Sequence, residues 1–168
     1  MTDVRPFRSS VTEPAVRGPD PGCRPVATAG ELAAHHRIRR AVFVTEQGLF
    51  SASDADEHDA WSTTVHVLGF VDGEPAGTVR LYPLTDTLWH GDRLAVLPAY
   101  RRSRLAAHLV RLAVTLAGER GGTRMQARVQ APNVRFFEFL GWEPTAPQAD
   151  HLGVPHRWMA IPLQRTGT

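Results

Sequence analysis

The segment Leu94–Ala113, LAVLPAYRRSRLAAHLVRLA, constrains the fold of this chain more than any other. A short apolar strand, expected over residues 91–96, must stop before Pro98, because proline has no backbone N–H for a central ladder. A helix follows, since leucines recur at helical spacing and Gly121 provides a stop. These leucines are Leu105, Leu109, Leu112 and Leu116. The segment therefore predicts a strand, a turn and an amphipathic helix in direct succession.

Three arginines, Arg101, Arg102 and Arg104, crowd the start of that helix. Cations there are unfavourable by about 0.3–1 kcal/mol each, because a helix N-terminus already carries partial positive charge. A bound polyphosphate would reverse this, since guanidinium groups and free backbone amides both bind anions. The alternative is a solvated basic surface; the strand-to-helix junction favours the anion.

The remaining segments alternate between strand and helix patterns. Thr28 and Glu31 have capping-box spacing, and Asp72-Gly73 is a strong hairpin signal. The expected elements are strand 23–27, helix 28–44, a two-strand hairpin over 65–84, strand 124–129, helix 132–140, and strands 142–145 and 155–163. This order predicts an α+β fold with a mixed sheet.

Length and composition narrow the function. A chain of 168 residues fits one domain, which we place at 23–165 after a disordered tail at 1–22 that is rich in Pro, Gly and Arg. With a single cysteine, no signal peptide and no membrane-length apolar run, a cytoplasmic protein is expected. A formal charge of +2, and arginines without interleaved aromatic residues, disfavour nucleic acid as a partner.

Five motifs resemble a known superfamily. RLAVLPAYRRSRLAAHLV is similar to the acetyl-CoA signature of the GCN5-related N-acetyltransferases (GNAT), and FFEFLGW resembles the end of their last short helix. RRAVFVTEQ, VHVLGF and GVPHRWMAI are similar to one subgroup, with the bacterial nitrogen-starvation N-acetyltransferases as the branch it resembles most. The resemblance implies a mixed, mostly antiparallel central sheet that splays between strands 4 and 5, with helices on both faces.

The resemblance also implies acetyl-CoA as co-substrate. The splayed strand, Leu94, Ala95 and Val96, would pair with the pantetheine arm, and the turn after it would bind the diphosphate. That turn comprises Arg101, Arg102, Ser103, Arg104, Leu105, Ala106 and Ala107. Gln130, with Asn133 as second choice, takes the place of the superfamily's coenzyme-facing Asn, and Phe137 completes the cofactor set.

Two of these residues depart from the superfamily pattern. Arg104 replaces the middle glycine of the signature; we expect helical backbone angles there, so that only clearance beside the phosphates is lost. Phe137 replaces the tyrosine that often protonates the departing thiolate. Because a thiol has a pKa of roughly 8.5, that protonation is a modest demand near neutral pH.

Acetyl transfer needs a base for the amine proton, and Glu46, His66 and His156 are the candidates, all within subgroup motifs. For each one a purely structural role is an open alternative. Asp92 is a fourth candidate, expected more as a loop anchor, and Arg80 is expected on a solvated strand face or beside an acidic group of the acceptor.

The acidic segment 54–61, DADEHDAW, invites a metal interpretation. It lacks the glycine and distal glutamate of a calcium loop, and the histidines show no zinc spacing. We therefore expect no metal and a solvated, mobile lid over the acceptor.

The leading hypothesis is an N-acetyltransferase that moves an acetyl group from acetyl-CoA to a primary amine of a small molecule. A degenerate, non-catalytic acyl-CoA sensor is the alternative. Acyl-homoserine-lactone synthases, which share the Arg-x-x-Val-Phe opening, are a further one. No membrane partner is expected, and a homodimer stays open.

Overall fold

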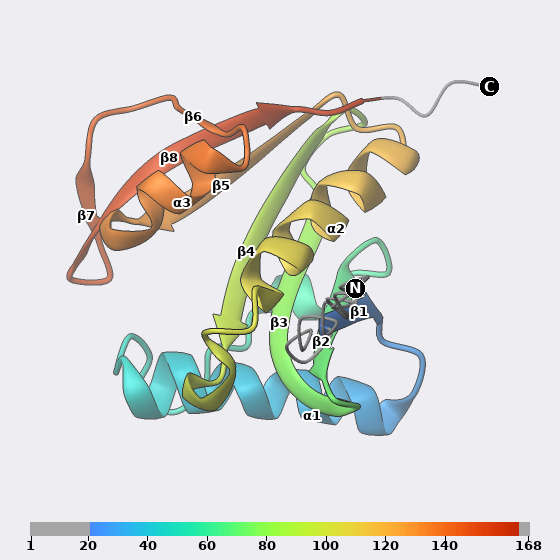
Figure 1. The fold of residues 1–168 in the computed structure, drawn as a ribbon. Helices are drawn as coiled ribbons and strands as arrows, with labels where there is room; N and C mark the ends of the chain where they lie inside the picture. Colours follow the sequence, from blue (N-terminus) through green and yellow to red (C-terminus); the bar gives the residue numbers. More distant parts are fainter. Residues whose placement is uncertain (1–20, 165–168) are drawn as a thin grey trace, which may run out of the picture.

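The computed structural model describes residues 21–164, which form one sheet with helices on both faces (Figure 1). The strands are β1 (Pro21–Pro25), β2 (Val65–Val71), β3 (Glu74–Pro83), β4 (Leu88–Val96), β5 (Arg124–Gln130), β6 (Glu143–Pro144), β7 (Ala149–His151) and β8 (Val154–Pro162). The α-helices are α1 (Ala29–Arg39), α2 (Leu105–Glu119) and α3 (Val134–Phe139). A π-helical segment, Arg40–Glu46, continues α1, and short 3-10 turns occupy Glu57–Ala60, Pro98–Tyr100 and Ala131–Asn133.

The sheet has the strand order β1-β2-β3-β4-β5-β8-β6, with β7 also paired to β8. All neighbours are antiparallel except β4 and β5, which run parallel from Leu88 opposite Arg124 to Gly91 opposite Ala127. Beyond Gly91 the two strands separate, and Figure 1 shows the fork opening between them. The predicted mixed, mostly antiparallel sheet with a splay between strands 4 and 5 is therefore confirmed.

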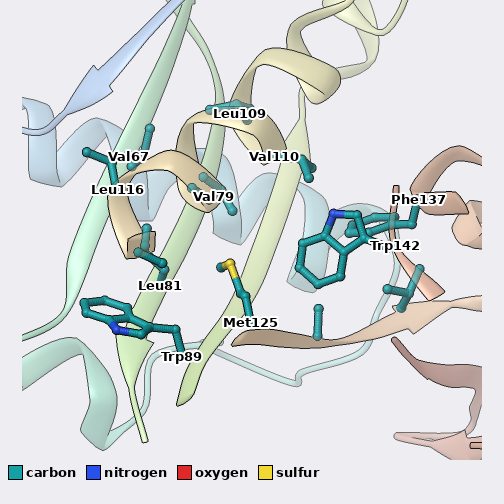
Figure 2. Packing of buried hydrophobic residues seen from close by; sticks show 14 of the residues in the cluster. Val67, Val79, Leu81, Trp89, Leu109, Val110, Leu116, Met125, Phe137 and Trp142 are labelled. Carbon is teal, nitrogen blue, oxygen red and sulfur yellow. The ribbon is translucent and has the colours of Figure 1, made fainter. Parts of the chain in front are cut away.

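Side chains alternate between the two faces of the sheet. Val67, Val79 and Leu81 pack with α2 and α3 in one core, which also holds Phe137 and Trp142 (Figure 2). Leu68 and Ala95 point to the opposite face and pack with Ile38, Val42 and Phe43 from α1 and its π-helical continuation. We call these the α2 face and the α1 face.

Two facing glycines bring the start of α2 close to the sheet. Gly69 and Gly77 lie opposite each other in the β2–β3 register. A Cβ atom on Gly69 would lie 2.8 Å from the Leu105 side chain, and one on Gly77 would lie 2.9 Å from it. Because neither glycine has a side chain, Leu105 is almost fully buried, at 1% exposure, and the first turn of α2 is fixed beside the fork.

Local signals identified most elements. Asp72 and Gly73 both have positive φ, as the tight β2–β3 hairpin requires, and the Thr28 hydroxyl accepts the Glu31 amide at 3.1 Å. Glu31 caps the Ala27 amide rather than that of Thr28. The helical winding expected to end near Val44 continues to Glu46 in π form, and β7 lies in a stretch expected to be a loop.

The predicted boundary between the tail (1–22) and the domain (23–165) lies within β1. Pro21 and Gly22, assigned to the tail, pair with Val71 and Phe70, so the sheet begins before residue 23. Residues 1–20 and 165–168 lie outside the described residues. No helix between residues 21 and 164 is long and apolar enough to cross a membrane.

Candidate active site

A bulge in β4 marks the point where the sheet opens. Thr78 pairs with Ala95 and Arg80 with Asp92, so Arg93 and Leu94 together face the single residue Val79. Arg93 has φ +54°, an uncommon conformation for an arginine. The Val79 carbonyl lies 3.2 Å from Nε2 of the buried His35. The bulge lies just beyond Gly91, the last β4 residue that pairs with β5.

A cleft of about 210 Å³ passes through this fork and joins the two faces of the sheet. On the α2 face it is lined by Val110, Phe137 and Trp142, and on the α1 face by Arg128 and Trp158 among others. Of the predicted residues, the lining includes Leu94, Gln130, Asn133, Phe137 and His156. Two reagents approaching from opposite faces could therefore meet between β4 and β5.

The start of α2 presents unpaired backbone donors. In the described chain, the amides of Arg102, Arg104, Ala106 and Ala107 have no hydrogen-bond acceptor, whereas the Leu105 amide lies 3.4 Å from the Ser103 hydroxyl. The Ser103 hydroxyl itself donates to the Tyr100 carbonyl. Free amides at a helix start are suited to an anion.

The three arginines at this turn have different partners. Arg101 donates from Nη2 to both carboxylate oxygens of Glu46, at 2.6 and 2.7 Å, and from Nε to the Val96 carbonyl at 3.1 Å. Its charge is thereby compensated, and it ties the π-helical segment to the end of β4. Arg102 and Arg104 are exposed, and within residues 21–164 neither has a carboxylate partner.

The expected helical backbone of Arg104 is wrong. Arg104 is the N-cap of α2 and has φ +65° and ψ 9°, which is the left-handed region. A non-glycine residue is disfavoured there by about 1–2 kcal/mol, because its Cβ approaches the following carbonyl oxygen. The departure from glycine at this position therefore strains the backbone. Its side chain is exposed and does not line the cleft.

The three predicted bases occupy different environments. His156, 7% exposed, lines the cleft, and its Nδ1 lies 2.8 Å from the Val154 carbonyl. Glu46 is paired with Arg101 and lies next to Gln47, which does line the cleft. His66 is buried on β2 outside the cleft lining, with Nε2 at 3.0 Å from Asp59. Only His156 therefore reaches the cleft directly.

The acidic segment is not a solvated lid. Asp54 is 3% exposed, and its carboxylate accepts from Nε of Arg39 at 2.6 Å and Nε of Arg93 at 2.9 Å. The segment is thus held against α1 and the bulge. The expectation was wrong because the arginines that hold the segment lie far from it in sequence.

Arg80 joins the same network from β3. It is fully buried, and it binds Asp92 at 2.7–2.8 Å and Asp56 at 2.6–3.0 Å, so the predicted solvated position is wrong. Burial alone would raise the pKa values of Asp59 and Asp92. Hydrogen bonds from His66 and Arg39 to Asp59, and from Arg80 to Asp92, outweigh this effect and lower both pKa values. Asp92 therefore serves as an anchor of the bulge.

One group of side chains resembles a metal-ligand set. The ligand atoms of His36, Asp59 and His66 all lie within 4.8 Å of one another. Asp59 already accepts hydrogen bonds from Arg39 at 2.7 and 3.1 Å, and Nη1 of Arg80 lies 3.1 Å away. A cation would have to compete with two guanidinium groups, so the geometry gives little support to a metal ion here.

Sequence reasoning missed several residues at the cleft. Gln47 accepts a hydrogen bond at 3.0 Å from Gln130, which joins the π-helical segment to β5. Arg128 and Trp158 lie side by side on neighbouring strands. Gln47, Arg93 and Trp158 stand inside motifs that the sequence singles out, so a signal existed. Arg128 stands where one branch of the superfamily carries a glutamate, but the contacts of Arg128 and Arg93 depend on strand pairing and the bulge.

Comparisons with known proteins agree with this geometry. The model of the acetyltransferase (GNAT) family matches residues 32–142. The uncharacterised protein YyaT of Bacillus subtilis is 27% identical over 144 residues, which are 85% of this chain and 97% of YyaT. The nitrogen-starvation branch is not confirmed by these matches.

Two solved structures share the fold. A candidate N-acetyltransferase from Lactobacillus plantarum has a TM-score of 0.77 and 27% identity, covering 86% of this chain and 99% of that one. An aminoglycoside 6'-N-acetyltransferase in complex with coenzyme A has a TM-score of 0.70 and 16% identity, with 87% and 99% covered.

Proposed function

Because this chain belongs to the acetyltransferase (GNAT) family, we propose that it moves the acetyl group of acetyl-CoA to a primary amine of a small molecule. The amine attacks directly, with both substrates bound together. The observation that carries the proposal is the cleft through the fork, which connects the α2 face to the α1 face. A solved structural neighbour, the aminoglycoside acetyltransferase, is a complex with coenzyme A, which supports the choice of cofactor.

The diphosphate of the coenzyme binds at the start of α2. The free amides of Arg102, Arg104, Ala106 and Ala107 supply hydrogen bonds, and the uncompensated guanidinium groups of Arg102 and Arg104 supply charge. Arg101 acts indirectly, because its pairing with Glu46 fixes the turn.

The pantetheine arm lies along the edge of β4 that β5 leaves open. Leu94, Ala95 and Val96 follow the last β4–β5 pair, so no strand covers this edge, and of its acceptors the Val96 carbonyl is already bound by Arg101. Gln130 and Asn133 lie on the other wall of the cleft. The thioester then reaches the bulge, where backbone amides near Leu94 stabilise the oxyanion.

His156 is the general base. A carbonyl oxygen only accepts hydrogen bonds, so the contact with Val154 requires a proton on Nδ1 of His156. In the neutral ring the lone pair is then on Nε2, and it can take the amine proton as the C–N bond forms. Glu46 and His66 are assigned positioning roles, since each is held in an ion pair or hydrogen bond outside the cleft lining.

The leaving group departs without an acid at position 137. As the tetrahedral intermediate collapses, the C–S bond breaks and its electron pair remains on sulfur as a thiolate. Phe137, which packs edge-on against Trp142 at 5.2 Å, has no hydroxyl to donate. Since a free thiol has a pKa of roughly 8.5, the thiolate leaves readily near neutral pH and collects its proton from solvent.

A non-catalytic acyl-CoA sensor is the second candidate. The missing hydroxyl at Phe137 and the strained Arg104 favour it, because both depart from the family signature. The two functions share the cofactor site and differ in turnover alone.

The test measures acetyl-CoA binding by calorimetry and coenzyme A thiol release with a panel of amines. We expect Arg102→Ala to weaken acetyl-CoA binding about tenfold, as for a charge-assisted hydrogen bond. Arg111→Ala, an exposed arginine on the same helix and outside the cleft lining, is the control and should leave binding unchanged.

His156→Gln separates the two candidate functions. For an enzyme, kcat should fall about 100-fold while acetyl-CoA binding is retained. Binding without thiol release for any amine, in the unmodified protein, would favour the sensor. Absence of acetyl-CoA binding would rule out both.

A further inference from the structure

Arg128 differs from the arginines that form ion pairs around the fork. Arg39, Arg80, Arg93 and Arg101 each bind at least one carboxylate. No carboxylate of residues 21–164 lies within 4.0 Å of the Arg128 guanidinium, although Arg128 lines the cleft. A cation left uncompensated inside a cleft attracts an anion.

The position of Arg128 is fixed by its neighbours. Its guanidinium lies over the ring of Trp158, 4.5 Å from the centroid, and Trp158 is its register partner on β8. Nη1 lies 2.6 Å from Nδ1 and 3.0 Å from Nε2 of His151 on β7. The side chain is therefore positioned by two strands while remaining exposed to the cleft.

Arg128 faces away from the coenzyme's diphosphate. Its neighbours Ala127 and Val129 point into the core beneath α2, so alternation directs Arg128 to the α1 face. The start of α2 lies on the opposite face. An anion at Arg128 would therefore come from the second substrate, the acceptor.

Among the described residues that line the cleft, no free carboxylate offsets this charge on the α1 face. Asp92 lines the cleft and is held by Arg80, while Asp54 and Asp56 are held by Arg93 and others. Burial and, to a smaller extent, the charge of Arg128 lower the pKa of His151, so both favour the neutral form of that ring. The acidic segment thus gives no preference for a cationic acceptor.

We propose that Arg128 binds an anionic group of the acceptor, so that the accepted substrate is an amine that also carries a carboxylate. The inference rests on the proposed function. Arg128 directly follows Ala127, the last β5 residue paired with β4, so it lies at the fork where the thioester arrives. The amine and the anionic group must therefore be separated by few bonds, as in an α-amino acid. Apolar side chains of Phe50 and Leu152 in the cleft lining suit an uncharged remainder.

The experiment compares amino acids with their own carboxamides. Alanine, leucine and phenylalanine are each tested beside the amide, which keeps the amine and removes the negative charge. We expect the acid to have the higher kcat/KM, and Arg128→Gln to raise KM for the acid about 10- to 100-fold with little change for the amide. An aminoalkylphosphonate of matched length distinguishes recognition of a carboxylate from that of a phosphate-like group.

Arg124→Gln is the matched control. Arg124 lies on the same strand and face, about 13 Å along β5, and outside the cleft lining. This variant removes the same charge from the protein, so it should leave the acid-to-amide preference unchanged. An equal effect in both variants would show that net charge alone is responsible and would overturn the proposal.

A binding measurement separates this proposal from the proposed function. N-acetylphenylalanine and its amide are compared by ligand-detected NMR with the intact protein and Arg128→Gln. Tighter binding of the acid, lost in the variant, supports the anion site even if no amine is acetylated. Turnover of amides or polyamines in preference to amino acids overturns the role of Arg128 and leaves the transferase intact, as does equal binding of acid and amide.

Discussion

Two segments of this protein, the acidic residues 54–59 and the basic turn 101–104, each contain a dense cluster of like charges in sequence. The two clusters differ in how the folded structure pairs these charges. The acidic segment folds inward, and its aspartates are held by the buried Arg39 and Arg80 and by Arg93. The basic turn stays exposed, and two of its three arginines have no carboxylate partner in the described chain. Both segments border the same fork.

The difference follows from burial. In the low-dielectric interior an unpaired charge is costly, so every buried arginine of the network has found aspartates with short hydrogen bonds. At the surface, water solvates the guanidinium groups of Arg102 and Arg104, and they remain available to a ligand. Charges in the first segment hold the fold, whereas we propose that Arg102 and Arg104 in the second bind the coenzyme.

The variant with the largest expected effect is Arg80→Ala, which tests whether the acidic network stabilises the fold while the basic turn does not. Removing this fully buried guanidinium removes the hydrogen bonds that it donates to Asp92 and Asp56, so the free energy of unfolding should fall by about 3–5 kcal/mol. Arg102→Ala should change it by less than about 0.5 kcal/mol. Urea unfolding of both variants checks this, and equal losses would contradict the assignment of the two segments to different roles.

Acid should affect the buried region first, through His35. Burial lowers the pKa of His35 to about 3, so the folded protein holds this ring neutral while the unfolded chain protonates it below about pH 6.5. Stability from this group is complete above pH 6.5 and is lost as pH falls toward 3. Between pH 7 and pH 5 the loss is about 2 kcal/mol.

His35→Gln removes the titrating group and retains a donor for the Val79 carbonyl. Urea unfolding at pH 7 and pH 5 should therefore show a smaller pH dependence in the variant than in the unmodified protein. Asp56, Asp59 and Asp92 have lowered pKa values, so their contribution is lost only below about pH 4 and does not interfere. An unchanged slope in His35→Gln would refute the assignment.

The smallest effect is expected at Arg104, where variants separate the contribution of backbone strain from that of charge. Replacement by glycine relieves the left-handed strain and should raise the free energy of unfolding by about 1 kcal/mol, while loss of the cation weakens acetyl-CoA binding several-fold. Arg104→Ala removes the cation and keeps the strain, so it should weaken binding without stabilising. Tighter binding by Arg104→Gly would instead show that the side chain obstructs the phosphates.

Local patterns were sufficient for much of the fold. The leucine spacing of α2, the Asp72-Gly73 turn and the Thr28 cap each depend on residues close in sequence, and each is found where expected. The π-helical continuation to Glu46 and the short β7 were missed, because packing and pairing with β8 outweigh weak local preferences there.

For this protein, sequence alone determined the strand, the turn and the basic helix start, since these follow from short-range geometry and motif spacing. Tertiary structure decided which charges are compensated. Asp54 meets Arg39 and Arg93 across 15 and 39 residues of chain, whereas β5 directs Arg128 into the cleft, where no carboxylate of residues 21–164 pairs with it. Electrostatic pairing depends on distance in space, and the folded sheet alone sets that distance.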